Sequence, residues 1–181
     1  FSGIYFLNLM FYLIFAEENQ QITISFNTQS QINCNFNDDN CGWYTSIYND
    51  GQHNVRSWTR TSYGTPSSNT GPTSGHVCNV NNPIGGKFCV SSYNPTNHYV
   101  YTEATGYFNT YFDLIYQQQL LANSTSCGLI FWTSMYGSNM GSLFLQIKYN
   151  NTNTWQNIWS KSGNQGNSNW IQNVVNLPNS S

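Results

Sequence analysis

The heptapeptide LFLQIKY at residues 143–149 alternates between two sets of side chains. In an extended strand, Leu143, Leu145, Ile147 and Tyr149 would share one face, because successive side chains of a strand point to opposite faces. Other short runs after residue 17 carry β-branched and aromatic residues at alternate positions: 22–26, 55–61, 86–92, 98–103, 111–116, 129–135, 155–159 and 170–177. Clusters of Asn, Gly, Ser and Pro separate these runs, and helical periodicity is nearly absent. The pattern predicts an all-β domain, either a sandwich or a barrel.

The composition excludes several classes of function. The chain has 181 residues, enough for one domain with a substantial core, and only 7% of them are charged. Its five basic residues are too few to follow a phosphate backbone or to form a basic membrane-surface helix, so we expect neither nucleic acid nor a direct membrane contact as partner. An aromatic content of 17% in an Asn-rich chain also occurs in low-complexity segments. The regular apolar alternation favours a folded extracellular β-domain instead.

The N-terminal segment differs from the rest of the chain. Residues 4–16, IYFLNLMFYLIFA, are almost entirely apolar, and the polar sequence EENQQ follows. Such a run, ending at a small residue, predicts a secretory signal peptide over residues 1–16, truncated at its start and cleaved after Ala16. It is short for a transmembrane helix, and a buried helix is the alternative. Two further parts are expected: a mature N-terminal segment with the first strand, residues 17–31, and a domain, residues 32–181.

Secretion would place the cysteines in an oxidising compartment, where disulfides persist. There are five of them, so one lacks a partner within this chain. The cysteines are Cys34, Cys41, Cys78, Cys89 and Cys127. Three sequons are candidate sites for N-glycosylation in surface loops: Asn123, Asn150 and Asn179.

The sequence CNFNDDNCGWY, residues 34–44, admits three interpretations: a metal loop, a redox pair or a structural disulfide. Redox CxxC motifs have two residues between the sulfurs, whereas six separate these cysteines. A zinc site would need two more soft ligands. A disulfide that closes a small loop is therefore favoured, and it would stabilise the fold by about 2–3 kcal/mol. Phe36 and Trp43 would then anchor the loop in the core.

No catalytic motif is present. The histidines, which are expected in loops or on the surface, lie outside any metal-binding spacing: His53, His76 and His98. Glu103 and Asp113 could in principle form a glycosidase pair, but a coincidence is the better interpretation. Carbohydrate binding through exposed aromatic rings remains an alternative. Most of the tryptophans lie inside strand-like alternation and are expected in the core: Trp58, Trp132, Trp155, Trp159 and Trp170.

Several motifs, in this order, resemble the MAM domain of meprins, neuropilins and receptor-type tyrosine phosphatases. The first half carries Cys34-Asn-Phe36, Cys41-Gly-Trp43, Trp58-Thr-Arg60, Gly71-Pro72 with His76, and Gly86-Lys-Phe88. In the second half, CGLIFWTSMYGSNMGSL at 127–143 is similar to the family's Cys-Leu-x-Phe-Trp-Tyr-x-Met-x-Gly-x-x-x-Gly-x-Leu segment. The stretch from Trp159 to Trp170 resembles its Trp-x-x-x-Gly-x-Gln-Gly … Trp ending.

The resemblance implies a disulfide-stapled jelly-roll β-sandwich of two antiparallel sheets that does no chemistry. Such a module serves adhesion, oligomerisation or ligand docking outside the cell, with a protein or a second copy of itself as partner. The alternatives are an accessory domain of a secreted protease or other enzyme, and a lectin-like module. Membrane attachment would come only through a larger parent protein.

The resemblance also implies a disulfide map. The family pairs the cysteines matching Cys34 and Cys41 with each other, and pairs the one matching Cys127 with a cysteine near the domain's C-terminal end. That partner would lie beyond Ser181, so we expect the domain to be cut short at its C-terminal end. Cys78 and Cys89 match no family position and would close a hairpin as an extra bridge.

Calcium is the one cofactor that the resemblance raises. Some family members bind Ca²⁺ with the help of acids at positions where this chain has Asn35, Asn37 and Gly75. Asp38, Asp39 and Asp50 could compensate, but fewer charges mean a weaker site. We therefore expect no high-affinity Ca²⁺ site and no other cofactor.

Overall fold

A computed structural model of the chain describes residues 5–10, 13–14, 21–26, 33–34, 36–45, 48–49, 54–76, 97–103, 105–107, 110–120, 127–148 and 154–177. In this part of the chain every regular element is a β-strand, which confirms the all-β prediction. No helix in the described ranges is long and apolar enough to cross a membrane. Several predictions fall outside the described residues: the strand at 86–92, Asn35, Asp50, His53, Cys78, Cys89 and the three sequons.

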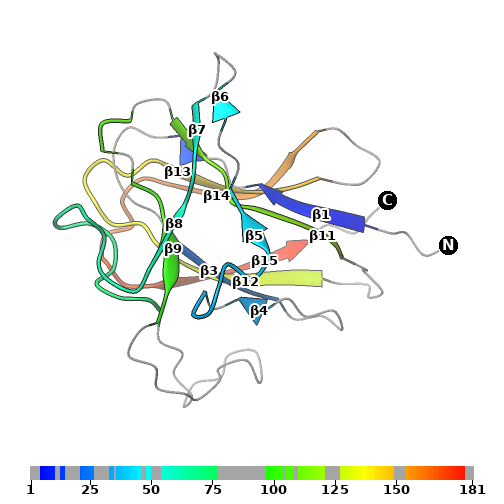
Figure 1. The fold of residues 1–181 in the computed structure, drawn as a ribbon, viewed down its shortest axis with the longest axis horizontal. Helices are drawn as coiled ribbons and strands as arrows, with labels where there is room; N and C mark the ends of the chain where they lie inside the picture. Colours follow the sequence, from blue (N-terminus) through cyan, green and yellow to red (C-terminus); the bar gives the residue numbers. More distant parts are fainter. Residues whose placement is uncertain are drawn as a thin grey trace.

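The described strands form two larger sheets and one small sheet (Figure 1). The first, sheet A, has the order β14 (Gln156–Ser162), β13 (Ser142–Ile147), β1 (Tyr5–Met10), β11 (Ile115–Leu120) and β5 (Trp43–Tyr44), and β2 (Leu13–Ile14) also pairs with β13. All of these pairs are antiparallel.

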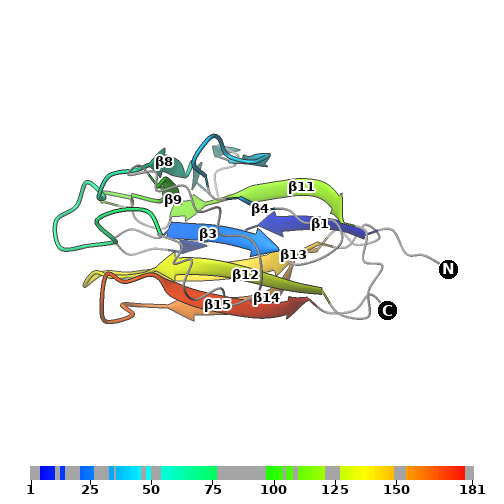
Figure 2. The same cartoon turned by 90° about the horizontal axis from the view of Figure 1, so that it is seen from below.

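The second sheet, sheet B, has the order β15 (Ile171–Leu177), β12 (Cys127–Ser134), β3 (Gln21–Phe26), β9 (Tyr99–Tyr101) and β8 (Thr59–Thr61), with β4 (Asn33–Cys34) beside β3. Its pairs are antiparallel as well. The small sheet, sheet C, joins β10 (Thr110–Phe112), β7 (Asn54–Arg56) and β6 (Tyr48–Asn49). Figure 2 shows β14 and β15 together along one side of the layered molecule, with β8 and β9 at the other.

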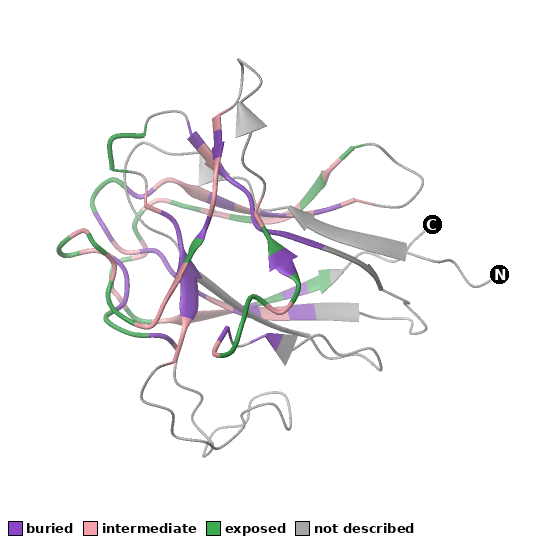
Figure 3. Ribbon diagram, viewed as in Figure 1, coloured by how far each residue is buried: buried purple, intermediate pink, exposed green. Residues whose placement is uncertain are grey.

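The inner faces of the strands supply the core. In β13 the burial alternates, with Leu143, Leu145 and Ile147 buried, which confirms the alternation predicted for LFLQIKY. Phe131 of β12 is fully buried and meets the half-buried Trp159 of β14 edge-on, with ring centroids 5.0 Å apart. Figure 3 shows buried residues along the strands and exposed ones concentrated in the loops.

Two of the predicted strands are each divided in the structure. The run 55–61 forms β7 and β8, and the run 111–116 forms β10 and β11. In both cases the chain passes from sheet C to one of the larger sheets. The two breaks are joined to each other, because Nε1 of Trp58 donates a hydrogen bond to Phe112 O at 3.0 Å. The stretch QQQ at 117–119 continues β11 as a strand.

Two strands lie in the segment that we interpreted as a signal peptide. The backbone of β1 pairs over six positions with β11, and β2 pairs over two positions with β13. These pairings describe the uncleaved chain, so removal of residues 1–16 stays a prediction.

Candidate functional site

The disulfide loop at residues 34–41 has the structure that its sequence predicts. Cys34 and Cys41 are bonded, with their Cα atoms 5.7 Å apart. Phe36 is fully buried and Trp43 nearly so, which confirms that both side chains anchor the loop in the core. Trp43 packs against Tyr116 with ring centroids 5.0 Å apart. The disulfide is therefore a structural closure rather than a redox pair or part of a zinc site.

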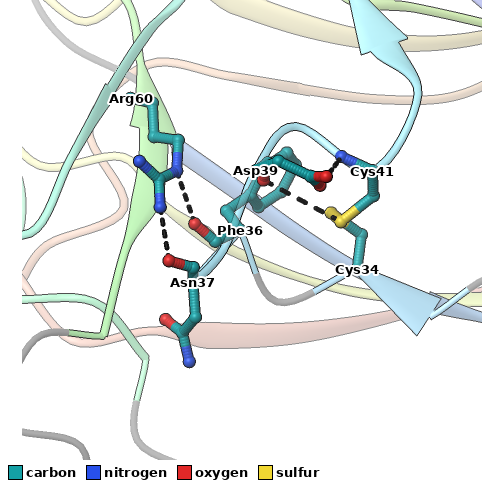
Figure 4. The surroundings of a disulfide bond; sticks show 6 residues. All are labelled: Cys34, Phe36, Asn37, Asp39, Cys41 and Arg60. Carbon is teal, nitrogen blue, oxygen red and sulfur yellow. Dashed lines mark hydrogen bonds between the residues drawn. A yellow bond between two sulfur atoms is a disulfide. The ribbon is translucent and has the colours of Figure 1, made fainter.

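Arg60 holds this loop from the neighbouring strand β8 (Figure 4). Its Nε donates to Phe36 O at 2.6 Å, and its Nη2 donates to Asn37 O. Phe36 has a φ of +58° and Cys41 one of +52°, a region that non-glycine residues rarely adopt. The disulfide and the guanidinium together therefore hold a backbone conformation that the loop residues would not favour alone.

Two of the side chains proposed for calcium, Asn37 and Asp39, have other roles in this loop. Asn37 Oδ1 accepts the backbone N–H of His98 at 2.8 Å, and Asp39 Oδ1 accepts that of Cys41 at 2.6 Å. Asp38 and Asp39 are exposed. Among the described residues, no group of three or more His, Cys, Asp or Glu side chains could hold a metal ion. The side chains of Asn37 and Asp39 thus serve as supports for the loop backbone, and the weakness of any Ca²⁺ site stays a prediction.

A long loop, residues 62–76, crosses one end of the sandwich and is fixed along its length. At its start, the hydroxyl of buried Tyr99 donates to Tyr63 O. Further along, Ser67 Oγ donates to a carboxylate oxygen of Glu103 at 3.2 Å. The same carboxylate accepts the backbone N–H of Thr105 at 3.2 Å. Glu103 therefore ties two loops together. Asp113, the other carboxylate considered for a glycosidase pair, is fully buried.

The second half of the loop is fixed by backbone contacts. Gly71 N donates to Tyr136 O at 3.0 Å, and Nε1 of Trp170 donates to Ser74 O at 3.1 Å. Gly75 is buried, and a Cβ at this position would lie 2.2 Å from Asn97 O. No side chain can be accommodated there without moving the backbone, so in this chain glycine fits a position where some family members carry an acid.

His76, the last described residue of this segment, lies in a group of aromatic rings. Its ring stacks on Trp132 at 4.6 Å between centroids, and it meets Trp170 edge-on at 6.2 Å. Trp170 in turn meets Tyr99 edge-on at 5.7 Å. Burial lowers the pKa of His76 from 6.5 to about 4, so the imidazole is neutral at neutral pH. The prediction of His76 as a loop residue is correct, but it missed this packing role.

The prediction that five tryptophans lie in the core is partly wrong. Trp58 is buried, but the others are half-buried: Trp132, Trp155, Trp159 and Trp170. Trp132 and Trp159 lie in β12 and β14, whereas Trp155 and Trp170 directly precede β14 and β15. Among the described residues, the most exposed aromatic ring is that of Tyr63, which is 78% exposed although its backbone is fixed. A fixed backbone that presents an exposed aromatic ring suits recognition, because little entropy is lost when a partner binds.

This all-β fold, with its disulfide-closed opening loop, is that of a β-sandwich module. Residues 34–181 match the MAM domain family, meprin/A5/mu, and the chain belongs to this family. MAM domains are jelly-roll sandwiches, extracellular modules that mediate protein interactions. The predicted fold class is thereby confirmed, and a non-catalytic MAM domain is what the match detects.

A particular relative is neuropilin-1a of Danio rerio, which is 28% identical over 142 residues. That match covers 77% of this chain and 13% of the relative, so the chain spans a small part of the curated protein that it resembles. No solved structure matches the chain significantly.

Proposed function

We propose that this chain is a non-catalytic extracellular adhesion and protein-interaction module of a larger secreted or membrane-anchored protein. The observation that carries the proposal is the MAM match over residues 34–181, since modules of this family mediate protein interactions. The Cys34–Cys41 disulfide supports an oxidising, extracellular location.

The fixed loop at residues 62–76 is the surface that suits a partner best. It contains no charged residue, is rich in hydroxyl side chains, and carries the exposed ring of Tyr63. Aromatic side chains of this kind dominate the energetics of protein interfaces, where their truncation costs about 2 kcal/mol or more. Tyr63 is therefore the residue expected to anchor a protein partner.

Binding of the oxidised, Fc-fused chain to cell surfaces tests this role. We expect saturable binding that Tyr63→Ala weakens about tenfold or more. Tyr44→Ala is the matched control, because Tyr44 is also exposed but lies on β5 beside the disulfide loop. If the Tyr63→Ala and Tyr44→Ala variants show the same saturable binding, the loop is excluded as the site. If the wild-type chain binds neither cells nor itself, the proposed function is contradicted.

The predicted processing belongs to the same proposal. Residues 1–16 would be removed on secretion, leaving residues 17–31 ahead of the domain. N-terminal sequencing of the secreted chain should then begin at Glu17, and an N-terminus that retains the apolar run would contradict this. Peptide mapping without reduction should find Cys78 bridged to Cys89; a bridge from either one to Cys127 would overturn that pairing.

Carbohydrate binding is the second candidate, favoured by the exposed ring of Tyr63 beside a stretch rich in hydroxyl groups. A glycan array on which the oxidised chain binds no sugar would remove it. The three sequons at Asn123, Asn150 and Asn179 remain candidate glycosylation sites, which mass spectrometry of the secreted chain would test.

A further inference from the structure

Among the described strands, four end the main strand orders of the two larger sheets, beside which the two-residue strands β2 and β4 each pair with one neighbour: β5, β14, β8 and β15. The edge of a sheet presents unpaired backbone groups, and proteins blunt such edges with short strands, charges, prolines or bulges. Three of these edges are blunted in one of those ways. β5 has two residues, and β8 has three, one of them Arg60. β14 carries Lys161, and its pairing with β13 has a register shift.

β15 is the exception. It has seven residues, IQNVVNL, with no charge and no proline, and in the described part of the chain it pairs with β12 alone. Its inward-facing residues Asn173 and Val175 are buried, so the strand is held firmly in the sheet. At the middle of its outward face, Val174 is 63% exposed. A long, flat, uncharged edge of this kind is a template for a further strand.

The sequence of β15 is partly symmetric about Val174. If the strand pairs antiparallel with a copy of itself at this centre, Ile171 lies opposite Leu177 and Gln172 lies opposite Asn176. Val174 then lies opposite its own copy. Asn173 lies opposite Val175, so apolar residues meet apolar residues and amides meet amides at five of the seven positions. It brings no like charges together, because the strand has none. Outward-facing residues stay beside outward-facing ones, which a one-residue shift would not allow.

One charged side chain, that of Lys161, contacts β15 at its buried residue Asn173. Lys161 Nζ donates to Asn173 Oδ1 at 3.0 Å and lies 5.6 Å from the centre of the Trp159 ring. Asn173 is itself buried, and its amide donates to Thr133 Oγ1 at 3.0 Å. The open edge thus presents backbone groups, amides and a valine, which favours an uncharged, self-complementary strand over a charged peptide.

We propose that β15 pairs antiparallel with β15 of a second copy of this chain, about a two-fold axis at Val174, so that the two copies of sheet B become one continuous sheet. Such a contact uses the same patch on both copies and closes as a dimer. The inference rests on the proposed role as an interaction module and names a partner for it. A contact of one strand per copy is small, so the dimer is weak and forms most readily where chains are crowded on a surface.

Sedimentation velocity of the oxidised chain, over a range of concentrations up to its solubility limit, tests the proposal. We expect a reversible monomer–dimer equilibrium. Val174→Lys and Val174→Glu should each weaken the dimer about tenfold or more, because each places two like charges opposite each other on the axis. An equimolar mixture of the two variants should restore dimers, since opposite charges then meet. Thr59→Lys is the control, because it adds the same charge to exposed Thr59 on β8, at the far edge of sheet B, and should leave the dimer unchanged.

Three results would overturn the self-pairing: a wild-type chain that is monomeric at every concentration, charged Val174 variants that dimerise as wild type does, or a mixture that fails to restore dimers. Open-ended aggregation in place of a dimer would overturn it as well. Because Val174 is exposed, its variants should unfold at the wild-type temperature, which checks that they are folded. Cell binding through Tyr63 is measured separately, so a failure of the self-pairing leaves the proposed function to be judged by its own test.

Discussion

Replacing Arg60 with Met would keep most of the apolar stem and remove the guanidinium that ties β8 to the disulfide loop. The two lost hydrogen bonds run to Phe36 O, at 2.6 Å, and to Asn37 O. A hydrogen bond to a charged group contributes about 1.5–3 kcal/mol. The guanidinium is partly buried, so its return to water in the unfolded chain offsets part of the sum. We expect the variant to lose about 2–4 kcal/mol of unfolding free energy, or about 30- to 700-fold in the folding equilibrium.

Equilibrium unfolding of the oxidised chain in urea, followed by tryptophan fluorescence, measures this loss. The midpoint should fall while the slope stays constant, because the surface exposed on unfolding is nearly unchanged. Arg60→Lys is the control: it keeps the charge but lacks the planar fork, so its loss should be intermediate. A Met variant within about 0.5 kcal/mol of wild type would refute the reasoning, since that is the range of ordinary surface substitutions.

The same measurement can separate Arg60 from the disulfide. Both hold the loop at residues 34–41, so their contributions should not be additive. In a chain with Cys34→Ser and Cys41→Ser, itself less stable by about 2–3 kcal/mol, the Arg60→Met change should cost less than in the oxidised chain. Equal costs in both backgrounds would show that the guanidinium acts independently of the loop closure.

Two further predictions concern the end of the long loop. Gly75→Ala places a Cβ 2.2 Å from Asn97 O and should lower thermal stability by about 1–3 kcal/mol, whereas Gly64→Ala, whose nearest contacts lie at 3.9 Å, should be tolerated better; equal melting temperatures would contradict this. Because burial lowers the pKa of His76 from 6.5 to about 4, the unfolded chain binds a proton that the folded chain does not. The unfolding free energy should therefore fall as the pH drops from 6.5 to about 4. In urea titrations at several pH values, His76→Phe should make this fall smaller; the same dependence on pH in both proteins would contradict the prediction.

The positions of most strands could be predicted because alternation is a local property. Residues two apart share a face wherever the chain is extended, so the runs that became β12, β13 and β15 are visible in the sequence. The breaks in 55–61 and 111–116 could not be predicted in the same way. Alternation does not say to which sheet a strand belongs, and at both breaks the chain changes sheet.

The candidate site could likewise be predicted only where it depends on residues that are close together in the sequence. The disulfide and its anchors Phe36 and Trp43 follow from the spacing within one short stretch. The packing of His76 against Trp132 and the hydrogen bond from Trp170 to Ser74, across 96 positions, do not. Both require the folded chain to bring distant loops and strands together at one end of the sandwich.

The sequence by itself determined the all-β class, the closure of the loop at residues 34–41 and the membership of the MAM family. Only the tertiary structure decided that the loop's oxygen atoms support its backbone through Arg60, His98 and Cys41, and that β15 ends the described part of its sheet without a protecting charge. The reason is physical: side-chain period and short-loop closure depend on neighbours in the chain. Hydrogen-bond partners and sheet edges depend on which distant segments meet.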